Sequence, residues 1–423
     1  MSQTTNQPAT DRPTLNADLA PRPSDAEVAG RTRIGSWRVQ TDALRAYTML
    51  FALLVIWLAF QWATANPENP YGFFLLPRNF SNLMRQASVT GVLAVGMLMV
   101  IVAGQIDLSV GSVVGLAGGI AAIVQGWLGW GLGPSLAAGI AVGVLIGAFQ
   151  GGLTAYLNIP AFIVTLGGLL AWRGVILGLT RGETVPVALP GFKMIGQDYV
   201  APVAGWALAA LAIGAVVLAN VRRERARRRY ELGAAGAAVM ALRVALPSAL
   251  VLAFVYWMNS YEIAPGRFAG IPVPVFVLLA VALGGGFLTQ HTTFGRYLYA
   301  IGGNPDAARL SGISLRKHVL AVFCLMGGLA GLAAIIYTAR VGSGAPDAGV
   351  LLELDAIAAC VIGGTSLMGG RGTVFGALLG ALIMASLDNG MSLTEVKPYT
   401  QMIVKGAILV AAVGLDMAGR RRG

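Results

Sequence analysis

The chain has 423 residues, of which 56% are hydrophobic and 12% charged, and its formal net charge is +11. Globular domains carry about 25% charged residues, so this composition excludes an ordinary soluble protein and predicts an integral membrane protein. Its two cysteines, Cys324 and Cys360, lie in apolar stretches and are expected to be buried free thiols.

The N-terminal segment, residues 1–43, is rich in Pro, Thr and Asp and has no apolar core. A secretory signal peptide needs an apolar stretch of roughly 7–15 residues. The segment is therefore predicted to be a disordered tail.

From Leu44 onward, twelve apolar stretches approach the roughly 20 residues that cross a bilayer as a helix. They cover residues 44–65, 84–104, 107–128, 133–156, 161–180, 200–220, 239–260, 271–289, 318–340, 355–369, 372–390 and 399–417. Gly or polar residues interrupt the third and the tenth, which are interpreted as broken or re-entrant, so ten full spans is the alternative. The predicted fold class is an all-α polytopic membrane protein with about 10–12 transmembrane helices.

Basic residues indicate the orientation, because Lys and Arg gather in short cytoplasmic loops. They cluster in the N-terminal tail, in a loop predicted over residues 221–238 that contains RRERARRR, in a loop over 290–317, and at the C-terminal end, 418–423. With twelve spans, all four regions fall on one side. Both termini are therefore expected to be cytoplasmic, and orientation accounts for the positive charge without nucleic acid; contact with anionic lipid is a weaker addition.

Glycine recurs every four residues in three stretches, of which Gly139, Gly143, Gly147 and Gly151 form the longest. Such stripes let membrane helices approach closely, and packing is the favoured interpretation. A smooth face would also let helices slide. The stretches GQIDLSVGSVVG (104–115) and GTSLMGGRGTVFG (364–376) each place a polar break before a Gly-rich helix, which suggests an internal repeat.

Two polar residues lie inside apolar stretches, where such groups are costly and tend to mark function. Asp107, in AGQIDLSVG, either caps the third stretch or lines a pathway. Arg173 lies well inside the fifth stretch, so a buried acidic or carbonyl partner is expected, with structural pairing favoured over substrate contact.

Other polar residues carry less weight. Asp388 and Lys405 lie nearer the ends of their stretches and are expected to be solvated. Asp107 then remains the single plausible buried carboxylate, which disfavours a proton- or sodium-driven carrier. Since none of the four lysines lies in a phosphate-binding Gly-rich loop and no His or Cys pair has ligand spacing, neither a cofactor nor a metal is expected, and an enzyme is disfavoured.

The stretch FGRYLYAIGGNPDAARLSGI, residues 294–313, predicts a short capped helix over Pro305–Ser311. Asn304 is a favourable N-cap, Pro305 suits the first helical position, and Gly312 can take the left-handed conformation that closes a helix. An isolated helix below about 12–15 residues is marginal in water, so this one is expected to need a surface to dock on. A plain connector is the alternative.

Four motifs in order carry a resemblance to a known family: GQIDLSVGSVVGLAGGIAA, NIPAFIVTLGGLLAWRG, TTFGRYLYAIGGNPDAARLSGI and IGGTSLMGGRGTVFGALLGA. Together they resemble the permease subunits of bacterial ABC importers for monosaccharides, over Leu44 to Leu415. Within that family, the fifth-stretch motif and the extra length around 190–260 most resemble the xylose-type members. The arginine-rich insertion after residue 220 and the long N-terminal tail depart from the family's general pattern.

The resemblance implies that the short helix is the coupling helix, which docks on a separate ATP-binding subunit. It carries this role onto Asn304, Pro305, Asp306, Ala307, Ala308, Arg309, Leu310 and Gly312. Ala307 and Ala308 would give a small surface for close approach, and Arg309 would offer a charge.

The resemblance further implies alternating access in the inner membrane, with a second permease chain and a periplasmic sugar-binding protein as partners. Because a neutral sugar needs hydrogen-bonding groups, the pathway candidates are Gln105, Asp107, Ser109, Thr165 and Arg173. The alternatives are an ABC permease for another sugar or for branched-chain amino acids, an ion-coupled secondary carrier and, more distantly, an intramembrane enzyme.

Overall fold

The computed structural model describes residues 47–67, 69–230 and 236–421. The chain divides into two units, Met1–Thr48 and Met49–Gly423, and nearly all described residues belong to the second. The predicted tail over residues 1–43 lies outside the described residues.

Among the described residues, eight helices are long and apolar enough to cross a membrane. They are α2 (Pro77–Val102), α4 (Leu132–Tyr156), α5 (Ala161–Thr180), α7 (Pro202–Arg229), α8 (Ala237–Asn259), α9 (Val273–His291), α12 (Leu315–Val341) and α14 (Val374–Leu393). Shorter apolar helices are Tyr47–Ala63, α3 (Val110–Gly126) and the Pro398–Gly414 part of α15 (Pro398–Arg421). The remaining helices are α6 (Pro190–Gln197), α10 (Thr293–Gly303), α11 (Pro305–Leu310) and α13 (Leu352–Ile362). The chain is an all-α polytopic membrane protein, as predicted.

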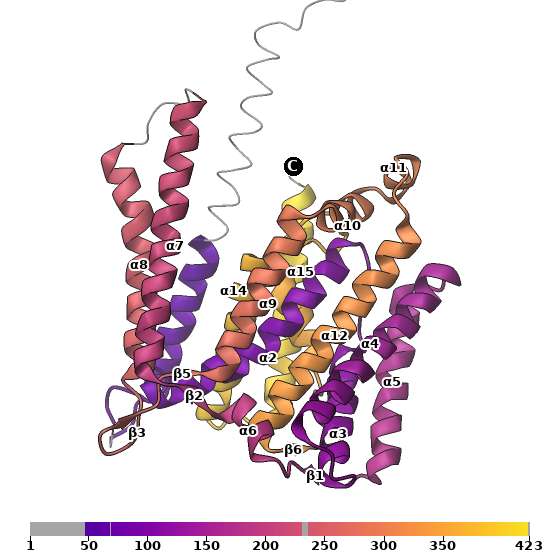
Figure 1. Ribbon diagram of the computed structural model, residues 1–423, viewed down its shortest axis with the longest axis horizontal. Coiled ribbons are helices and arrows are strands. Elements are labelled where there is room, and N and C mark those ends of the chain that lie inside the picture. Colours follow the sequence, from indigo (N-terminus) through magenta and orange to yellow (C-terminus); the bar gives the residue numbers. More distant parts are fainter. Residues whose placement is uncertain (1–46, 68, 231–235, 422–423) are drawn as a thin grey trace, which may run out of the picture. The chain divides into compact units, whose positions relative to one another are not determined.

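Six short strands pair into three antiparallel two-stranded ribbons within the described part of the chain. β1 (Val185–Pro186) pairs with β6 (Ser343–Gly344), β2 (Tyr199–Val200) with β5 (Ile271–Pro272), and β3 (Glu262–Ala264) with β4 (Arg267–Phe268). In the second unit, these ribbons lie at the end opposite to α10, α11 and the C-terminus (Figure 1).

The tenth predicted stretch, 355–369, does not form a full span, in agreement with its interpretation as broken or re-entrant. Its helix, α13, has 11 residues, about 16 Å at 1.5 Å per residue, too short for a hydrocarbon layer of about 30 Å. The helix ends because Gly364 takes a left-handed conformation (φ 85°) and the amide of Thr365 donates back to Cys360 O. The interruption noted in the sequence is therefore real.

The basic segment predicted as a loop over residues 221–238 is helical in its first half. Helix α7 continues through the arginine-rich stretch to Arg229. Arg and Glu favour helix, and Glu224 pairs with Arg228 one turn on, at 3.7 Å. The rest of the predicted loop contains residues 231–235, which lie outside the described residues.

The glycine stripe of α4 packs against α12, as predicted. All four of its glycines are buried, and a Cβ on Gly143 would overlap the carbonyl oxygen of Gly327 on α12. The two backbones therefore lie in direct contact, which only residues without a side chain permit.

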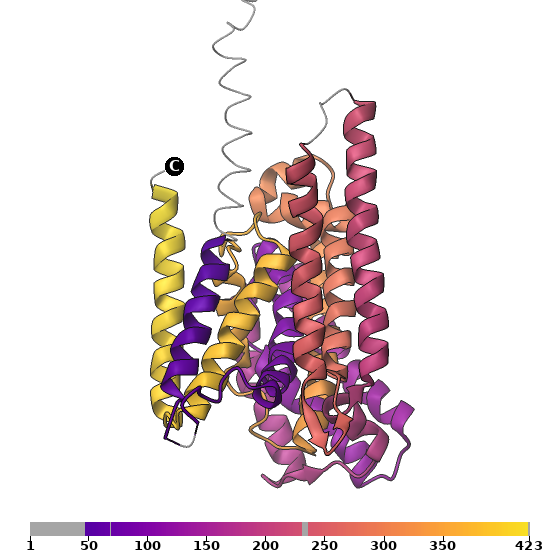
Figure 2. The same cartoon turned by 90° about the vertical axis from the view of Figure 1, so that its left-hand side faces the viewer.

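Helices α2 and α12 lie at the centre of the core, whereas α7 and α8 are mostly exposed and stand to one side (Figures 1 and 2). Cys360 is buried in this core, as expected, but the other free thiol, Cys324, is only half-buried on α12. The expectation that both cysteines are buried is therefore correct for one.

Two short helices begin inside the bundle after a non-helical segment. Residues 103–109 return from the end of α2 and lead into α3, and residues 343–351 return from the opposite end, after α12, and lead into α13 (Figure 1). The first residues of α3 and α13 meet: a Cβ on Gly111 would overlap both Gly349 O and the carboxylate of Glu353. The break before α3 and the break before α13 are therefore adjacent in the bundle, while the internal repeat suggested by the 104–115 and 364–376 stretches stays a prediction.

Candidate functional site

The short capped helix forms as predicted, and α11 ends at Leu310, one residue earlier than expected. The side chain of Asn304 accepts from the amide of Ala307 at 3.0 Å. Pro305 occupies the first turn, and Gly312 closes the helix with φ 82°. Each end of α11 is therefore fixed by a local hydrogen bond or a left-handed residue, so this exposed segment has a defined shape.

The exposed side of α11 differs in one residue from the prediction. Ala308 is 4% exposed and faces the protein itself, so it cannot contribute to an external surface. Ala307 and Arg309 are exposed, and Leu310 is 89% exposed. Leu310 and Arg309 are therefore the large side chains that α11 presents outward.

Helix α10, which the sequence analysis did not predict, connects α11 to the bundle. It begins at an N-cap, Thr292, whose side chain accepts from Gly295 N at 3.2 Å. At its other end Gly302 touches the backbone of Val102, where a Cβ would overlap the carbonyl oxygen. Tyr299 donates through its hydroxyl to Gly372 O at 2.8 Å. Helix α10 is therefore seated directly on the ends of α2 and α14.

The extended segment before α3 brings together the predicted polar residues. Asp107 is 4% exposed, and its Oδ1 accepts from both the amide (2.9 Å) and the hydroxyl (2.6 Å) of Ser109. The Ser109 hydroxyl also lies 3.0 Å from Gln150 Oε1. Thr165 on α5 is fully buried and its hydroxyl lies 3.2 Å from Ile106 O.

Asp107 does not cap α3, because the N-cap is Ser109 and no side chain accepts from the first helical amides. Its two bonds to Ser109 instead order the residues just before the helix. Gln105, four residues before Ser109, is half-buried on the same segment.

Arg173 has the carbonyl partners that its position predicts. Its Nη1 donates to Pro346 O and to Ala348 O, each at 2.7 Å. Both carbonyls belong to the series of turns, residues 346–351, that leads into α13. The structure therefore separates Arg173 from the other four pathway candidates, which gather around residues 103–109.

The first turn of α13 carries two buried carboxylates that the sequence analysis missed. Glu353 is 8% and Asp355 2% exposed, and they follow Leu351, which has a left-handed backbone (φ 68°). A helix N-terminus stabilises negative charge. Both lie in LLELDAIAAC: Glu353 comes just before the predicted tenth stretch and Asp355 is its first residue. The signal available in the sequence was therefore charge at the start of a weak apolar stretch.

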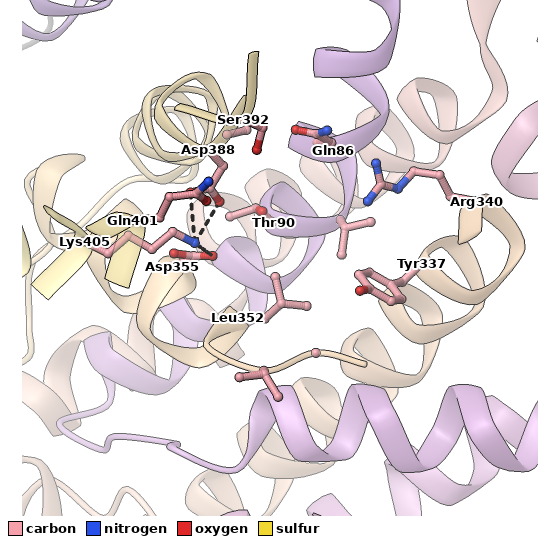
Figure 3. Close-up of a pocket in the computed structure, with 14 residues that line it drawn as sticks. Gln86, Thr90, Tyr337, Arg340, Leu352, Asp355, Asp388, Ser392, Gln401 and Lys405 are labelled. Carbon is pink, nitrogen blue, oxygen red and sulfur yellow. Dashed lines mark hydrogen bonds and ion pairs between the residues drawn. The ribbon is translucent and has the colours of Figure 1, made fainter. Parts of the chain in front are cut away.

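Lys405 and Asp388, predicted to be solvated, instead form a partly buried ion cluster with buried Asp355 (Figure 3). The Lys405 ammonium lies 2.9 Å from each carboxylate, and the side chains of Lys405, Asp355 and Asp388 are 14%, 3% and 28% exposed. The prediction failed because it placed residues by distance from the ends of their stretches, whereas α13, α14 and α15 bring them together in space.

These carboxylates also overturn one sequence argument. Asp107 is not the only buried carboxylate, because Glu353 and Asp355 are buried as well. A scarcity of buried acids therefore no longer counts against an ion-coupled carrier. Within the described residues, no group of three or more His, Cys, Asp or Glu could hold a metal ion.

Comparison with known proteins covers nearly the whole chain. Residues 79–413 match the family described as "Branched-chain amino acid transport system / permease component". The chain is 45% identical to the xylose transport system permease protein XylH of Escherichia coli (strain K12) over 400 residues, 95% of this chain and 98% of that protein. The corresponding Haemophilus influenzae protein is 45% identical over 386 residues, 91% of this chain and all of that protein. No solved structure matches the chain.

A second group of relatives is more distant. The chain is 35% identical to the ribose import permease protein RbsC of Escherichia coli (strain K12) over 381 residues, 90% of this chain and 94% of that protein. The matches to both groups span α10, the exposed helix α11, and the short helices α3 and α13 with the non-helical segments before them.

Proposed function

Because the chain belongs to the family of permease components of branched-chain amino acid transport systems, we propose that it is the membrane subunit of an ATP-driven importer for a monosaccharide, D-xylose in the first place. The observation that carries this proposal is the 45% identity to a xylose transport permease over 95% of the chain. Identity to the ribose permease is lower, 35%. Xylose is therefore favoured over ribose, and a sugar over an amino acid.

The proposal assigns ATP hydrolysis to a separate subunit that docks on α11. Exposed Leu310 would enter an apolar groove of that subunit and Arg309 would meet an acidic group, because a protruding apolar residue flanked by charge suits such a groove. Asn304, Pro305, Asp306, Ala307 and Gly312 hold the shape of this surface; Ala308 anchors it to the chain. A periplasmic sugar-binding protein would meet the opposite end, in the inner membrane of a bacterium, and a second permease chain would complete the channel.

Helix α10 supplies the connection between docking and transport. Gly302 lies against the end of α2, and Tyr299 is hydrogen-bonded to the backbone before α14. A displacement of α11 would therefore move the ends of two core helices as one body. This seat is the proposed path by which ATP binding switches access between the two sides of the membrane.

The extended segment at residues 103–109 is proposed to border the sugar pathway. This segment is shaped by hydrogen bonds of Asp107, Ser109 and Thr165 within the protein. Half-buried Gln105 is therefore the side chain best placed to hydrogen-bond a hydroxyl group of the sugar. Arg173 would support the pathway indirectly, because its hydrogen bonds to Pro346 O and Ala348 O position the segment before α13. If alanine at Gln105, Asp107, Ser109 and Thr165 together left transport unchanged, the pathway would lie elsewhere.

An ion-coupled carrier is the second candidate, favoured by the buried carboxylates Glu353 and Asp355. The two functions differ in what drives uptake. Vesicles holding the chain with its ATP-binding subunit and binding protein should take up labelled D-xylose only with ATP, and excess L-leucine should not compete. Uptake by the chain alone, driven by a proton or sodium gradient, would support the carrier instead.

A further inference from the structure

A polar cavity of about 250 Å³ lies between α2, α12, α13, α14 and α15. That is room for roughly eight water molecules, at about 30 Å³ each in the liquid, a space on the scale of a monosaccharide. The polar groups that line it are Gln86, Thr90, Tyr337, Arg340, Asp355, Asp388, Gln401 and Lys405, and Figure 3 shows them arranged around a common space.

The cavity lies towards the end of the bundle opposite to α11. Gln401 and Lys405 are in the first turns of α15, and Arg340 is in the last turn of α12. Both of these helix ends lie opposite to α10, α11 and the C-terminus (Figure 1). Ser392, exposed in the last turn of α14, lines its outer part.

The charges around the cavity balance. Asp355 and Asp388 bring two negative charges, and Lys405 and Arg340 bring two positive ones. The Lys405 cluster occupies one side, and Arg340 and Tyr337 lie across from it (Figure 3). A site of zero formal charge gives no net attraction to an anion or a cation. Because it retains many donors and acceptors, it suits a neutral ligand rich in hydroxyl groups.

One acceptor in the cavity wall has no partner. Asp355 is 2% exposed, and while its Oδ2 binds Lys405 at 2.9 Å, its Oδ1 has no hydrogen bond. Across the cavity, Arg340 Nε is a buried donor without a partner. An unpartnered buried polar atom costs about 1–3 kcal/mol. A hydroxyl group can both donate and accept, so a ligand with several hydroxyls would satisfy both sides.

From the cavity, its balanced charge and its unpartnered acceptor, we propose that the permease holds a neutral monosaccharide here, with Asp355 Oδ1 accepting from a sugar hydroxyl. The proposal rests on the proposed function and adds a binding site to it. Gln86, Thr90 and Gln401 provide further hydrogen-bonding groups from α2 and α15.

The site adjoins the meeting point of the two broken helices. Gly349 and Leu352 line the cavity, and Gly349 also touches Gly111 at the start of α3. A sugar held by Asp355 would thus contact the segment that carries the N-terminus of α13. Sugar binding in the cavity would therefore act on the contact between Gly349 and Gly111, which lies between the cavity and residues 103–109.

A labelling experiment tests the site in the full complex. Ser392→Cys, at the outer part of the cavity, is reacted with a membrane-impermeant maleimide in vesicles, and labelling of the native cysteines is measured in the unmodified chain and subtracted. D-xylose should slow the reaction, whereas the anion D-xylonate should not. Ala65→Cys, exposed and outside the cavity, is the matched control and should react equally with and without sugar.

Transport by variants provides the second measurement. Asp355→Asn keeps the shape of the side chain and leaves the Lys405–Asp388 pair intact, but it weakens the acceptor for the sugar hydroxyl. ATP-driven D-xylose uptake should therefore fall about tenfold or more, as expected from loss of a charged hydrogen bond. Thr90→Val should also reduce uptake. Asp198→Asn, an exposed carboxylate beyond the cavity, should leave it unchanged. ATP hydrolysis by the complex reports whether each variant is assembled.

The outcomes separate the two proposals. Absence of ATP-driven xylose uptake by the unmodified complex would overturn the proposed function. Normal uptake by the unmodified complex and equally by Asp355→Asn and Thr90→Val, with no protection of Ser392→Cys, would overturn the site alone. Protection by D-xylose that Asp355→Asn abolishes is the result that supports the site.

Discussion

The guanidinium of Arg173 donates to the carbonyl oxygen of Ala348 at 2.7 Å and so joins α5 to the turns that precede α13. The same nitrogen donates to Pro346 O. The position that a Cβ on Gly115 would take is 3.1 Å from this nitrogen, so α3, α5 and the segment before α13 meet around one charge. Arg173 thus holds the two broken helices in register, although it lies in neither.

Replacing Arg173 should therefore loosen this junction. Arg173→Met leaves the carbonyls of Pro346 and Ala348 without their donor, and hydrogen bonds to charged groups contribute about 1.5–3 kcal/mol. A lower thermal unfolding midpoint of the purified protein is expected, measured by tryptophan fluorescence in detergent. Arg267→Ala, which removes an exposed arginine, should leave the midpoint unchanged; equal midpoints for both variants would contradict this role.

Contact between α4 and α12 predicts a difference between two glycines of one helix. Gly143→Ala would place a methyl group against Gly327 O, and overpacking of this kind costs about 1–3 kcal/mol. A Cβ on Gly152, in the same helix, meets nothing within 4 Å. Thermal unfolding should therefore show a destabilised Gly143→Ala protein and an unaffected Gly152→Ala protein. Two identical curves would show that the helices do not touch there.

Neighbouring glycines test the α10 seat in the same way. Gly302→Ala would collide with Val102 O, whereas a Cβ on Gly303 meets nothing within 4 Å. We expect Gly302→Ala to lower sugar uptake per ATP hydrolysed, because the link between α11 and α2 is displaced, and Gly303→Ala to keep the ratio of the unmodified complex. A normal ratio for Gly302→Ala would show that the seat does not transmit motion.

The ion cluster of Lys405, Asp355 and Asp388 predicts a clear effect of removing its cation. Lys405→Met would leave the buried carboxylate of Asp355 without its cation and next to that of Asp388. Breaking a fully buried pair costs about 3–5 kcal/mol, and the partial exposure of Asp388 makes the loss smaller here. Lys397→Met, on an exposed lysine just before the same helix, is the matched control. The yield and the unfolding midpoint of the two variants should differ widely, and a stable Lys405→Met protein would contradict the assigned role of the cluster.

Local chemistry is what the sequence predicted best. The bounds of α5 agree with the predicted span at both ends, because Pro160 comes directly before an apolar stretch whose one charged residue is Arg173. The caps of α11 were predictable for the same reason, since Asn304, Pro305 and Gly312 act on their own neighbours. The carbonyl partners of Arg173 could be expected as a class of atom, but not as the particular residues Pro346 and Ala348.

Features that depend on several distant segments were beyond the sequence. Lys405 lies 50 residues after Asp355 and 17 residues after Asp388 along the chain. Only the fold reveals that the three side chains form a cluster. Charge at the start of a weak apolar stretch was available as a signal for Asp355, but the sequence does not indicate where the side chains of Glu353 and Asp355 point. The sequence analysis placed RRERARRR in a loop, although α7 continues through it to Arg229. A run of charged residues ends the membrane-spanning part of a helix but does not have to end the helix itself.

The central claim is that this permease is driven by ATP through α11, and one comparison tests it most directly. The complex is reconstituted in vesicles with its ATP-binding subunit and binding protein, and uptake of labelled D-xylose is measured with the unmodified chain and with Arg309→Glu. Arg309 is exposed, so the variant should insert and fold normally. ATP-dependent uptake that is lost in Arg309→Glu is the predicted result. Equal uptake by both, with or without ATP, would contradict the claim and leave α11 as a connector.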